Sequence, residues 1–350
     1  MYLEMGKTRR RYIFQVLNVL SFTDYEIGVG MGIGNVHKYV GEEEGFSLTK
    51  ADNYKAFLRR PASRNQFVFL SDQQDLLSAS PGWKKKVYVD PDCFGEGEDA
   101  FSVPFGVHPA QVLSGRDKQL DEYRAQDTKV TLLFAGACQP EGYATDAITK
   151  LFGKVPRSDL YESICQVLDG GDYTTTRDAD SLLNAEDKID AALFVLATDG
   201  VDNRVARENW FRVLAAADFF VAGPGVYMPM SHNVIEALAV GTIPIIEYPE
   251  LFSPDLSVAQ ACITFRGRQE FEERIRSCVE MEPSARANLK KTAMDYYDTH
   301  LSPKAAGRKL QREVLDRPTN PKDDIERIII NAEHESVDLL SSKSARGSDV

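Results

Sequence analysis

The chain has 350 residues, of which 43% are hydrophobic and 10% aromatic, and its formal net charge at pH 7 is −12. This length suffices for two ordinary α/β domains. The acidic balance excludes a general nucleic-acid binder, because neutralising phosphates requires surplus Lys and Arg.

The first part of the chain alternates between strand and helix patterns. Residues 2–5 predict a strand, residues 8–23 an amphipathic helix and residues 25–31 a second strand. Further strands are expected at residues 67–70 and 86–89. Such alternation is typical of an α/β domain. The basic and apolar start resembles a signal sequence, but its apolar run is short and no small-residue cleavage site follows.

The change from one domain to the other is expected after an extended segment. Each residue before a proline in 102–109 is disfavoured in helix, so this stretch predicts extended chain. We place the boundary near residues 110–128, with a bridging helix at 117–125. The expected division is an N-terminal Rossmann-like domain (1–112), a C-terminal Rossmann-like domain (113–310), and a helix with a disordered tail (311–350).

The second part of the chain opens with its strongest strand signal. Residues 130–136 are Val-Thr-Leu-Leu-Phe-Ala-Gly, followed by a loop of small residues and helices at 145–152 and 159–168, the latter capped by Ser158. Residues 172–182 read as irregular. The remaining expected elements are strands at 191–196, 218–222, 242–248 and 262–265 and helices at 207–216, 269–280 and 284–299.

The most informative segment is residues 223–247. A glycine-containing turn precedes Ser231, which is suited to cap a helix because its hydroxyl can accept from first-turn N–H groups. Gly241 follows the helix, where a left-handed residue favours glycine. Asn233 and Glu236 are three residues apart and therefore share one face of the helix. A buried strand of β-branched residues follows.

This segment carries a family resemblance. The run from Ser231 to Ile246, Ser-His-Asn-Val-Ile-Glu-Ala-Leu-Ala-Val-Gly-Thr-Ile-Pro-Ile-Ile, resembles the donor-binding signature of exostosin-like glycosyltransferases and their bacterial relatives. The resemblance implies a GT-B fold, in which two Rossmann-like domains face a cleft: an N-terminal acceptor domain (1–112) and a C-terminal nucleotide-sugar donor domain (113–310). It also implies transfer of a sugar from a nucleotide-diphosphate donor, with a UDP-sugar favoured, to a hydroxyl of a glycan or lipid-linked acceptor, by inversion and with no required cofactor or metal.

The resemblance also implies where the donor binds. The glutamate of the Glu-Ala-Leu motif, here Glu236, would accept hydrogen bonds from the ribose hydroxyls; the alternative is a solvent-facing helix residue. The N-terminus of the helix would hold phosphate. The full set of expected donor-binding residues is Gly136, Arg204, Arg207, Gly225, Ser231, His232, Asn233 and Glu236. For His232, Asn233 and the two arginines, an ordinary surface role stays open, and for Gly136 a tight turn.

The general base of an inverting enzyme would come from the N-terminal domain. Its candidates are His37, His108, Asp24, Glu26 and Asp72, and His108 is preferred because it lies in the interdomain segment. A structural role for this histidine is the alternative. The proton-abstracting group would contribute roughly 10²–10⁴-fold to the rate.

Three further patterns are weaker. Asp90-Pro-Asp92 and Asp178-Ala-Asp180 have the spacing of a metal-binding pair, but acidic pairs arise by chance in an acidic chain. Gly28 to Gly34 has alternating glycines without the dinucleotide spacing. The alternatives to a transferase are therefore a non-catalytic sugar-nucleotide-binding protein and, less favoured, an NAD-dependent oxidoreductase.

The cysteines and hydropathy bear on location. The five cysteines are scattered, odd in number and without CxxC spacing, which favours free thiols in a reducing compartment. No segment reaches the roughly 18 apolar residues that span a bilayer. We expect a cytoplasmic protein, with peripheral membrane association and removal of an anchor left open.

Overall fold

The chain forms two α/β units. The computed structural model describes residues 1–5, 10–30, 55–57, 64–90, 100–136, 147–168, 173–176, 179–186, 193–197, 205–225, 228–318 and 325–330. The first unit takes in the described residues of Met1–Arg116 and Thr299–Ala332, and the second those of Asp117–Asp298. Each unit contains one sheet in which every described pair of neighbouring strands is parallel. The expectation of two Rossmann-like domains is therefore confirmed.

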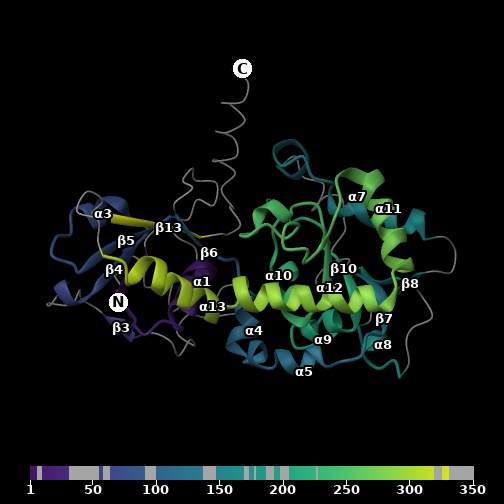
Figure 1. Ribbon diagram of the computed structural model, residues 1–350, viewed down its shortest axis with the longest axis horizontal. Coiled ribbons are helices and arrows are strands. Elements are labelled where there is room, and N and C mark those ends of the chain that lie inside the picture. The colour runs from purple at the N-terminus through teal and green to yellow at the C-terminus, as the bar shows by residue number, and fades with distance from the viewer. Residues whose placement is uncertain are drawn as a thin grey trace, which may run out of the picture. The chain divides into compact units, whose positions relative to one another are not determined.

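The sheet of the first unit has the strand order β3-β2-β1-β4-β5-β13-β6. Figure 1 labels β3, β4, β5, β6 and β13 of this sheet. Its strands are β1 (Tyr2–Glu4), β2 (Gly28–Gly30), β3 (Lys55–Phe57), β4 (Val68–Ser71), β5 (Lys85–Asp90), β6 (Phe101–Val103) and β13 (Ile325–Ile330). The chain thus returns at its end to place β13 between β5 and β6. This differs from the expected C-terminal helix and tail, because Ile325–Ile330 is a strand.

Helices and short turns connect these strands. They are α1 (Arg10–Leu20), η3 (Arg64–Gln66), α3 (Gln74–Ser78), α4 (Pro109–Leu113), η4 (Arg116–Lys118), η8 (Tyr297–Leu301), α13 (Pro303–Leu310) and η9 (Gln311–Leu315). The late helix α13 packs against the early helix α1. Gly307 permits this approach, since a Cβ there would collide with the carbonyl oxygen of Val19.

A buried lysine fixes the returning chain to the first sheet. The side chain of Lys85 donates to the carbonyl oxygens of Val314 and Arg317, the second at 2.9 Å. Its ammonium also lies 3.3 Å from the Glu326 carboxylate. A cation at the last carbonyls of a helical segment is favourable, because those carbonyls carry the negative end of the dipole. Lys85 therefore joins β5 to both η9 and β13.

The sheet of the second unit has the order β12-β11-β10-β7-β9-β8. Its strands are β7 (Val130–Gly136), β8 (Tyr173–Thr176), β9 (Leu193–Ala197), β10 (Ala217–Val221), β11 (Ile243–Ile246) and β12 (Ile263–Thr264). From β7 the chain builds first to one side and then, from β10, to the other. The topological switch point, where ligands of open α/β sheets bind, therefore lies between the carboxyl ends of β7 and β10.

Helices cover this sheet. They are α5 (Leu120–Arg124), η5 (Ala147–Leu151), α7 (Arg157–Val167), α8 (Asp180–Leu183), α9 (Trp210–Ala215), α10 (His232–Val240), η7 (Pro249–Leu251), α11 (Gly267–Glu280) and α12 (Pro283–Tyr296). Helix α7 packs against α11, whereas α10 packs against α5, α9 and α12. Residues 173–176 and 180–183 are thus a strand and a helix, so the expectation of an irregular stretch there was wrong.

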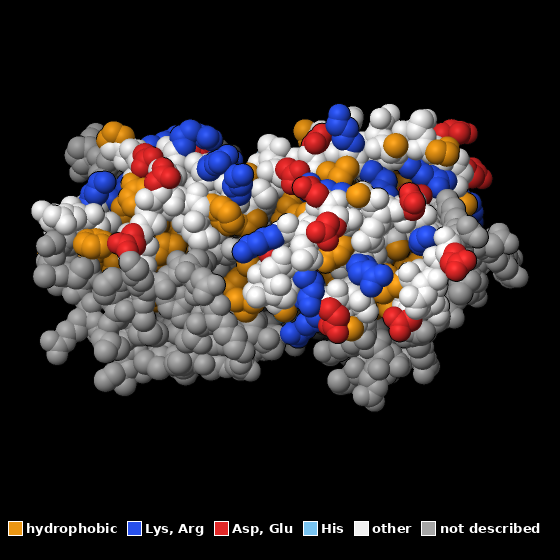
Figure 2. All heavy atoms as spheres, turned by 90° about the horizontal axis from the view of Figure 1, so that it is seen from below, with side chains coloured by type: hydrophobic (Ala, Val, Ile, Leu, Met, Phe, Trp, Pro, Cys, Tyr) orange, Lys and Arg blue, Asp and Glu red, His pale blue; other side chains and the backbone are white. Residues whose placement is uncertain are grey.

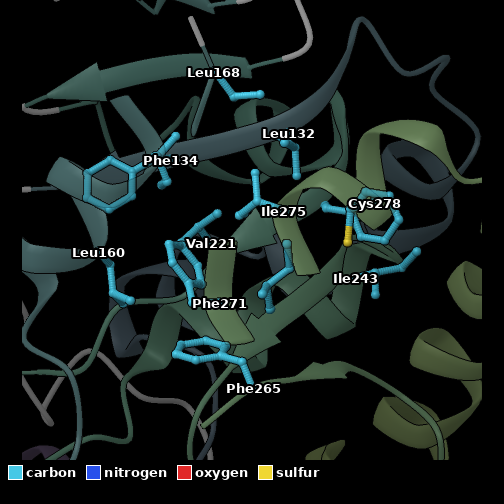
Figure 3. Close-up of a cluster of buried hydrophobic side chains, with 13 residues drawn as sticks. Leu132, Phe134, Leu160, Leu168, Val221, Ile243, Phe265, Phe271, Ile275 and Cys278 are labelled. Carbon is cyan, nitrogen blue, oxygen red and sulfur yellow. The ribbon is translucent and has the colours of Figure 1, made fainter. Parts of the chain in front are cut away.

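The main core of the second unit lies between the sheet and helices α7 and α11 (Figure 3). Side chains two apart on β7, Leu132 and Phe134, point to this face, as strand geometry requires. Phe271 and Ile275 are four apart on α11 and fully buried against them. This packing fixes the position of the strand ends at which the candidate site lies.

The surface is of mixed charge. Basic and acidic side chains are interspersed over the described part of the face drawn in Figure 2. Within the described ranges, no helix is long and apolar enough to cross a membrane.

Asp117, the first residue of the second unit, is poorly accommodated as an anion. Its Oδ1 is buried with no hydrogen-bond partner among the described residues. Burial raises the pKa of Asp117 from 3.8 to about 6, against smaller opposing effects of Lys118 and two backbone N–H groups. The folded state therefore holds the proton more tightly than the unfolded state, and this residue lowers stability as pH rises from about 4 to about 6.

We accordingly expect Asp117→Asn to stabilise the protein at pH 7.5 by about 1–2 kcal/mol, a value reduced for partial exposure. At pH 4, where the folded aspartate is protonated and the unfolded one is partly protonated, most of this stabilisation should be absent. Urea unfolding at the two pH values measures the difference. An equal effect at both would show that the charge is not the cause.

Candidate functional site

The strand ends at the switch point are built from glycine. In the β7–β10 register Leu133 faces Phe220, so Gly136 is level with Gly223 three residues further on. Gly136 has φ +141, a conformation that favours glycine. A Cβ on Gly223 would lie 2.7 Å from Cγ of Arg157. Both glycines therefore leave room for the side chain of Arg157, which begins α7.

Arg157 is a buried cation at this edge of the sheet. It is 8% exposed, and its Nη2 donates to the carbonyl oxygen of Gly223 at 3.2 Å. Its Nη1 would be 3.1 Å from a Cβ on Gly136, which places the guanidinium at the end of β7 as well. A planar guanidinium with five donors suits phosphate groups. We did not single out Arg157 in the sequence; its signal is a basic residue opening the helix that follows the glycine-ended β7.

Helix α10 has the predicted residues at both ends, but the predicted capping hydrogen bond at its start is not formed. Ser231 is the N-cap, with φ −139 and ψ 157, yet its hydroxyl makes no capping hydrogen bond. The Ser231 Oγ is buried and has no partner among the described residues. Gly241 adopts the left-handed conformation with φ +84, as expected. Similarly, α7 has Pro156 as its N-cap, so the expectation of a Ser158 cap was wrong.

The C-terminal end of α10 is firmly held. Arg124 donates from Nε to the carbonyl oxygen of Ala239 at 2.8 Å and makes a two-bond ion pair with Asp298. The hydroxyl of Thr242 donates to the carbonyl oxygen of Leu214 at 2.7 Å. These contacts tie the end of α10 to α5, α9 and η8, so its N-terminal turn is carried on a rigid element.

Glu236 is buried rather than solvent-facing. Only 2% of it is exposed, and its Oε2 accepts a hydrogen bond from Trp210 Nε1 at 2.7 Å. The alternative of a solvent-exposed helix residue is therefore wrong. The role of Trp210, which orients Glu236 from α9, was not predicted.

The other expected donor-binding residues are placed as follows. His232 and Asn233 are half-buried in the first turn of α10, and Gly225 lies in the preceding turn, where its N–H donates to the Pro229 carbonyl at 3.2 Å. Arg207 is exposed in the turn before α9. Arg204 lies outside the described residues. Gly225, Ser231, His232, Asn233 and Glu236 thus belong to α10 and its entry, and Gly136 to the end of β7.

The structure describes four of the five candidate bases. His108 caps α4, with its Nδ1 accepting from the Ala110 N–H at 3.1 Å, so the neutral ring carries its proton on Nε2. Asp24 accepts from the side chain of Gln311 at 3.0 Å, and Asp72 is fully buried. Glu26 is exposed, and His37 lies outside the described residues.

The structure describes part of the two acidic pairs and of the glycine-rich run at residues 28–34. Asp90 pairs with Arg327 at 2.8 Å, whereas Asp92 and Asp178 lie outside the described residues. No group of three His, Cys, Asp or Glu side chains that could hold a metal occurs in the described parts of the chain. A Cβ on Gly30 would collide with the hydroxyl of Tyr2. That glycine is thus explained by packing, which removes its support for a dinucleotide site.

Cys262 and Cys278 of the second unit are buried free thiols. Cys165, Cys262 and Cys278 form no disulfide. Burial raises the pKa of both Cys262 and Cys278 to about 12. Since the thiolate is the nucleophilic form, neither is suited to covalent catalysis.

Comparisons with known proteins give structural similarities only. No family model matches the chain, and no curated protein matches it. The chain is similar to Anabaena HepE in complex with UDP, with a TM-score of 0.42 and 11% identity over 90% of this chain and 99% of that one. It is similar to the N-terminal domain of Candida albicans trehalose-6-phosphate phosphatase, with a TM-score of 0.43 and 9% identity over 90% and 96%. The spinosyn rhamnosyltransferase SpnG gives a TM-score of 0.41 and 12% identity over 89% and 99%.

Proposed function

We propose that this chain is a GT-B glycosyltransferase, of exostosin-like type, that transfers a hexosyl or pentosyl unit from a nucleotide-diphosphate donor. The observation that carries the proposal is the buried guanidinium of Arg157 at the carboxyl ends of β7 and β10. A diphosphate leaving group needs fixed positive charge at this position, because negative charge develops on it as the glycosidic bond breaks. The protein HepE, with a similar fold, binds UDP, which supports a UDP-sugar as the donor.

The second element of the proposed donor site is the start of α10. The helix N-terminus carries partial positive charge, and the Ser231 hydroxyl is a buried group that a phosphate oxygen would satisfy. Glu236 would accept from the ribose hydroxyls while Trp210 holds its carboxylate in place. Arg157 and α10 would thus bind the two ends of one nucleoside diphosphate.

The proposed reaction is a direct displacement with inversion and without a required metal. An acceptor hydroxyl of a glycan or lipid-linked saccharide attacks the anomeric carbon, and the bond from that carbon to the diphosphate oxygen breaks. The hydroxyl proton passes to a base of the first unit, and the nucleoside diphosphate leaves with its charge held by Arg157 and the helix end. Among the bases, the preference for His108 stays a prediction.

The experiment that tests this function combines binding and turnover. Purified protein is titrated with UDP and GDP by calorimetry and then incubated with a set of UDP- and GDP-sugars and saccharide acceptors, with and without chelator. We expect UDP binding and sugar transfer that chelator does not abolish. Donor binding with neither transfer nor hydrolysis would instead identify a sugar-nucleotide-binding protein, and binding of NAD alone an oxidoreductase.

The role of Glu236 can be separated from its structural bond to Trp210. Glu236→Gln keeps an oxygen acceptor for the indole but removes the charge, so we expect UDP affinity to fall by about 1–3 kcal/mol, the cost of losing charge-assisted hydrogen bonds. Trp210→Phe, which removes the orienting donor, should weaken binding less. Calorimetry measures both. A Gln variant with normal UDP affinity and a lowered melting temperature would show that Glu236 only anchors α9 to α10.

A further inference from the structure

A cavity lies in the second unit on the side of α7 and α11. Its volume is about 1000 Å³, and it is bounded by the loop before α7, the loop after β11, the end of β12 and the start of α11. Glu236 and α10 do not line it. The loop at residues 153–156 contributes to its wall and leads directly into Arg157. The cavity is therefore separate from the proposed ribose site but adjoins the proposed diphosphate site along the chain.

The walls of this cavity are held by a hydrogen-bond network. Glu247, 7% exposed, accepts from the backbone N–H of Val155 at 2.6 Å and from that of Gly267 at 2.7 Å. Lys154 donates to the Glu247 carbonyl oxygen at 2.8 Å and to the Glu250 carboxylate at 2.6 Å. These bonds join three separate segments of the wall. The cavity is thus formed before any ligand enters.

The lining carries both signs of charge and both kinds of hydrogen-bonding group. Three of its side chains are cationic and five are carboxylates: Lys154, Arg266 and Arg268 against Asp159, Glu247, Glu250, Asp255 and Glu270. An excess of carboxylates disfavours a phosphate or diphosphate. No metal-holding group of side chains is found within the described residues. Three of the carboxylates are already paired, since Glu247 accepts from two backbone N–H groups, Glu250 from Lys154 and Glu270 from Arg274. The lining therefore offers a ligand hydrogen-bonding groups more than net charge, which favours an uncharged polar ligand.

Apolar surface interrupts this polar lining. Val155 and Pro249 are half-buried lining residues, whereas Phe265, which is 2% exposed, adds little surface. A sugar ring matches such a surface, because its hydroxyls both donate and accept hydrogen bonds while its C–H faces pack on apolar groups. The volume is at the upper end of the range of about 300–1,000 Å³ for ligand cavities. It exceeds what one sugar ring requires.

We infer that this cavity binds the sugar units of a saccharide chain, namely the non-reacting units of the acceptor. That the saccharide is the acceptor rests on the proposed function; that the cavity binds a saccharide rests on the cavity alone. The bound units would enter beside the loop that leads to Arg157, which brings the acceptor to the edge of the sheet where the donor binds. No residue of the cavity needs to take part in the reaction.

A pair of neighbouring substitutions tests the inference. Ser257 lines the cavity and is exposed, with its hydroxyl and N–H both bonded to Asp255 Oδ1, whereas Val258 is 79% exposed and does not line it. Ser257→Trp places an indole in the cavity, and Val258→Trp places one outside it. The probes are neutral tetrasaccharides of gluco, manno, galacto and N-acetylhexosamine type. Binding is measured by saturation-transfer NMR and calorimetry with UDP present at saturation.

We expect at least one tetrasaccharide to bind the unaltered protein and Val258→Trp equally, and to bind Ser257→Trp at least tenfold more weakly. A second pair guards against misfolding of the tryptophan variant. Arg266→Ala removes an exposed lining cation at the N-cap of α11 and should weaken binding several-fold, whereas Arg276→Ala, within α11 but outside the cavity, should not. The inference would be overturned if no tetrasaccharide binds. It would also be overturned if Ser257→Trp and Arg266→Ala both bind as tightly as the unaltered protein.

The UDP titration separates this inference from the proposed function. A protein that binds UDP and transfers sugar but shows no cavity-dependent saccharide binding would refute the cavity and leave the transferase proposal intact. A protein that binds a tetrasaccharide in the cavity but no nucleotide would refute the transferase and leave a saccharide-binding cavity.

Discussion

Arg157→Gln is expected to weaken UDP binding by about 2–3 kcal/mol, or roughly 30- to 150-fold, because hydrogen bonds to charged groups contribute about 1.5–3 kcal/mol each. Glutamine retains a donor for the Gly223 carbonyl oxygen, which Arg157 contacts at 3.2 Å, so the fold should be preserved. The loss in turnover should exceed the loss in binding, since charge on the leaving diphosphate grows in the transition state. Calorimetry with UDP and steady-state transfer kinetics measure the two effects.

Two further variants serve as controls for the Arg157→Gln prediction. Arg157→Lys keeps the charge but not the planar fork, and we expect it to recover part of the affinity. Arg276→Gln, on the exposed face of α11, should behave like the unaltered protein. Normal UDP affinity in a folded Arg157→Gln protein would remove the main support for the diphosphate site.

Local sequence patterns were sufficient where the determining residues are neighbours in the chain. The strand at residues 130–136 agrees in both bounds with β7, and Ser231 and Gly241 flank α10 as predicted. Each of these elements is specified within a few residues, by β-branched apolar runs, by a capping position or by a left-handed glycine.

Patterns failed where partners are far apart in the sequence. The run Ile-Glu-Arg-Ile-Ile-Ile becomes β13 only because it pairs with Lys86 to Asp90 on one side and with Phe101 to Val103 on the other. As an isolated apolar run it fits a helix or a strand equally. Lys85, which anchors the returning chain, directly precedes the strand expected at residues 86–89. Its burial follows from tertiary contacts with Val314 and Arg317.

The candidate site shows the same division. The α10 residues were identified from one contiguous motif. Arg157 was missed because its position depends on Gly136 and Gly223, which belong to two strands brought together by the sheet. The burial of Glu236 likewise depends on Trp210 from another helix. The sequence thus predicted the helix of the site, α10. Its cation, Arg157, and the donor that orients Glu236, Trp210, became evident only from the packing of the folded chain.

Asp218→Asn is expected to destabilise the second unit by about 2–4 kcal/mol. Asp218 lies near the start of β10, with its carboxylate 3.1 Å from Arg286 and 3.5 Å from Lys290 of α12. Breaking a buried ion pair costs about 3–5 kcal/mol, and the partial exposure of the two cations lowers that figure. The Nε of Arg286 is already buried with no partner among the described residues, so that cation loses its principal compensation.

The position of Asp218 makes this prediction specific. It lies at the opposite end of β10 from Gly223, so the variant should unfold at lower urea concentration but retain its UDP affinity at 25 °C. Asp121→Asn is the matched control, because Asp121 is fully exposed and 3.9 Å from Arg124, and such surface pairs contribute about 0–1 kcal/mol. Equal midpoints for the two variants would show that the Asp218 pairs do not hold α12 to the sheet. A loss of UDP affinity in a folded Asp218→Asn protein would instead show that the attachment of α12 affects the far end of β10, near Gly223.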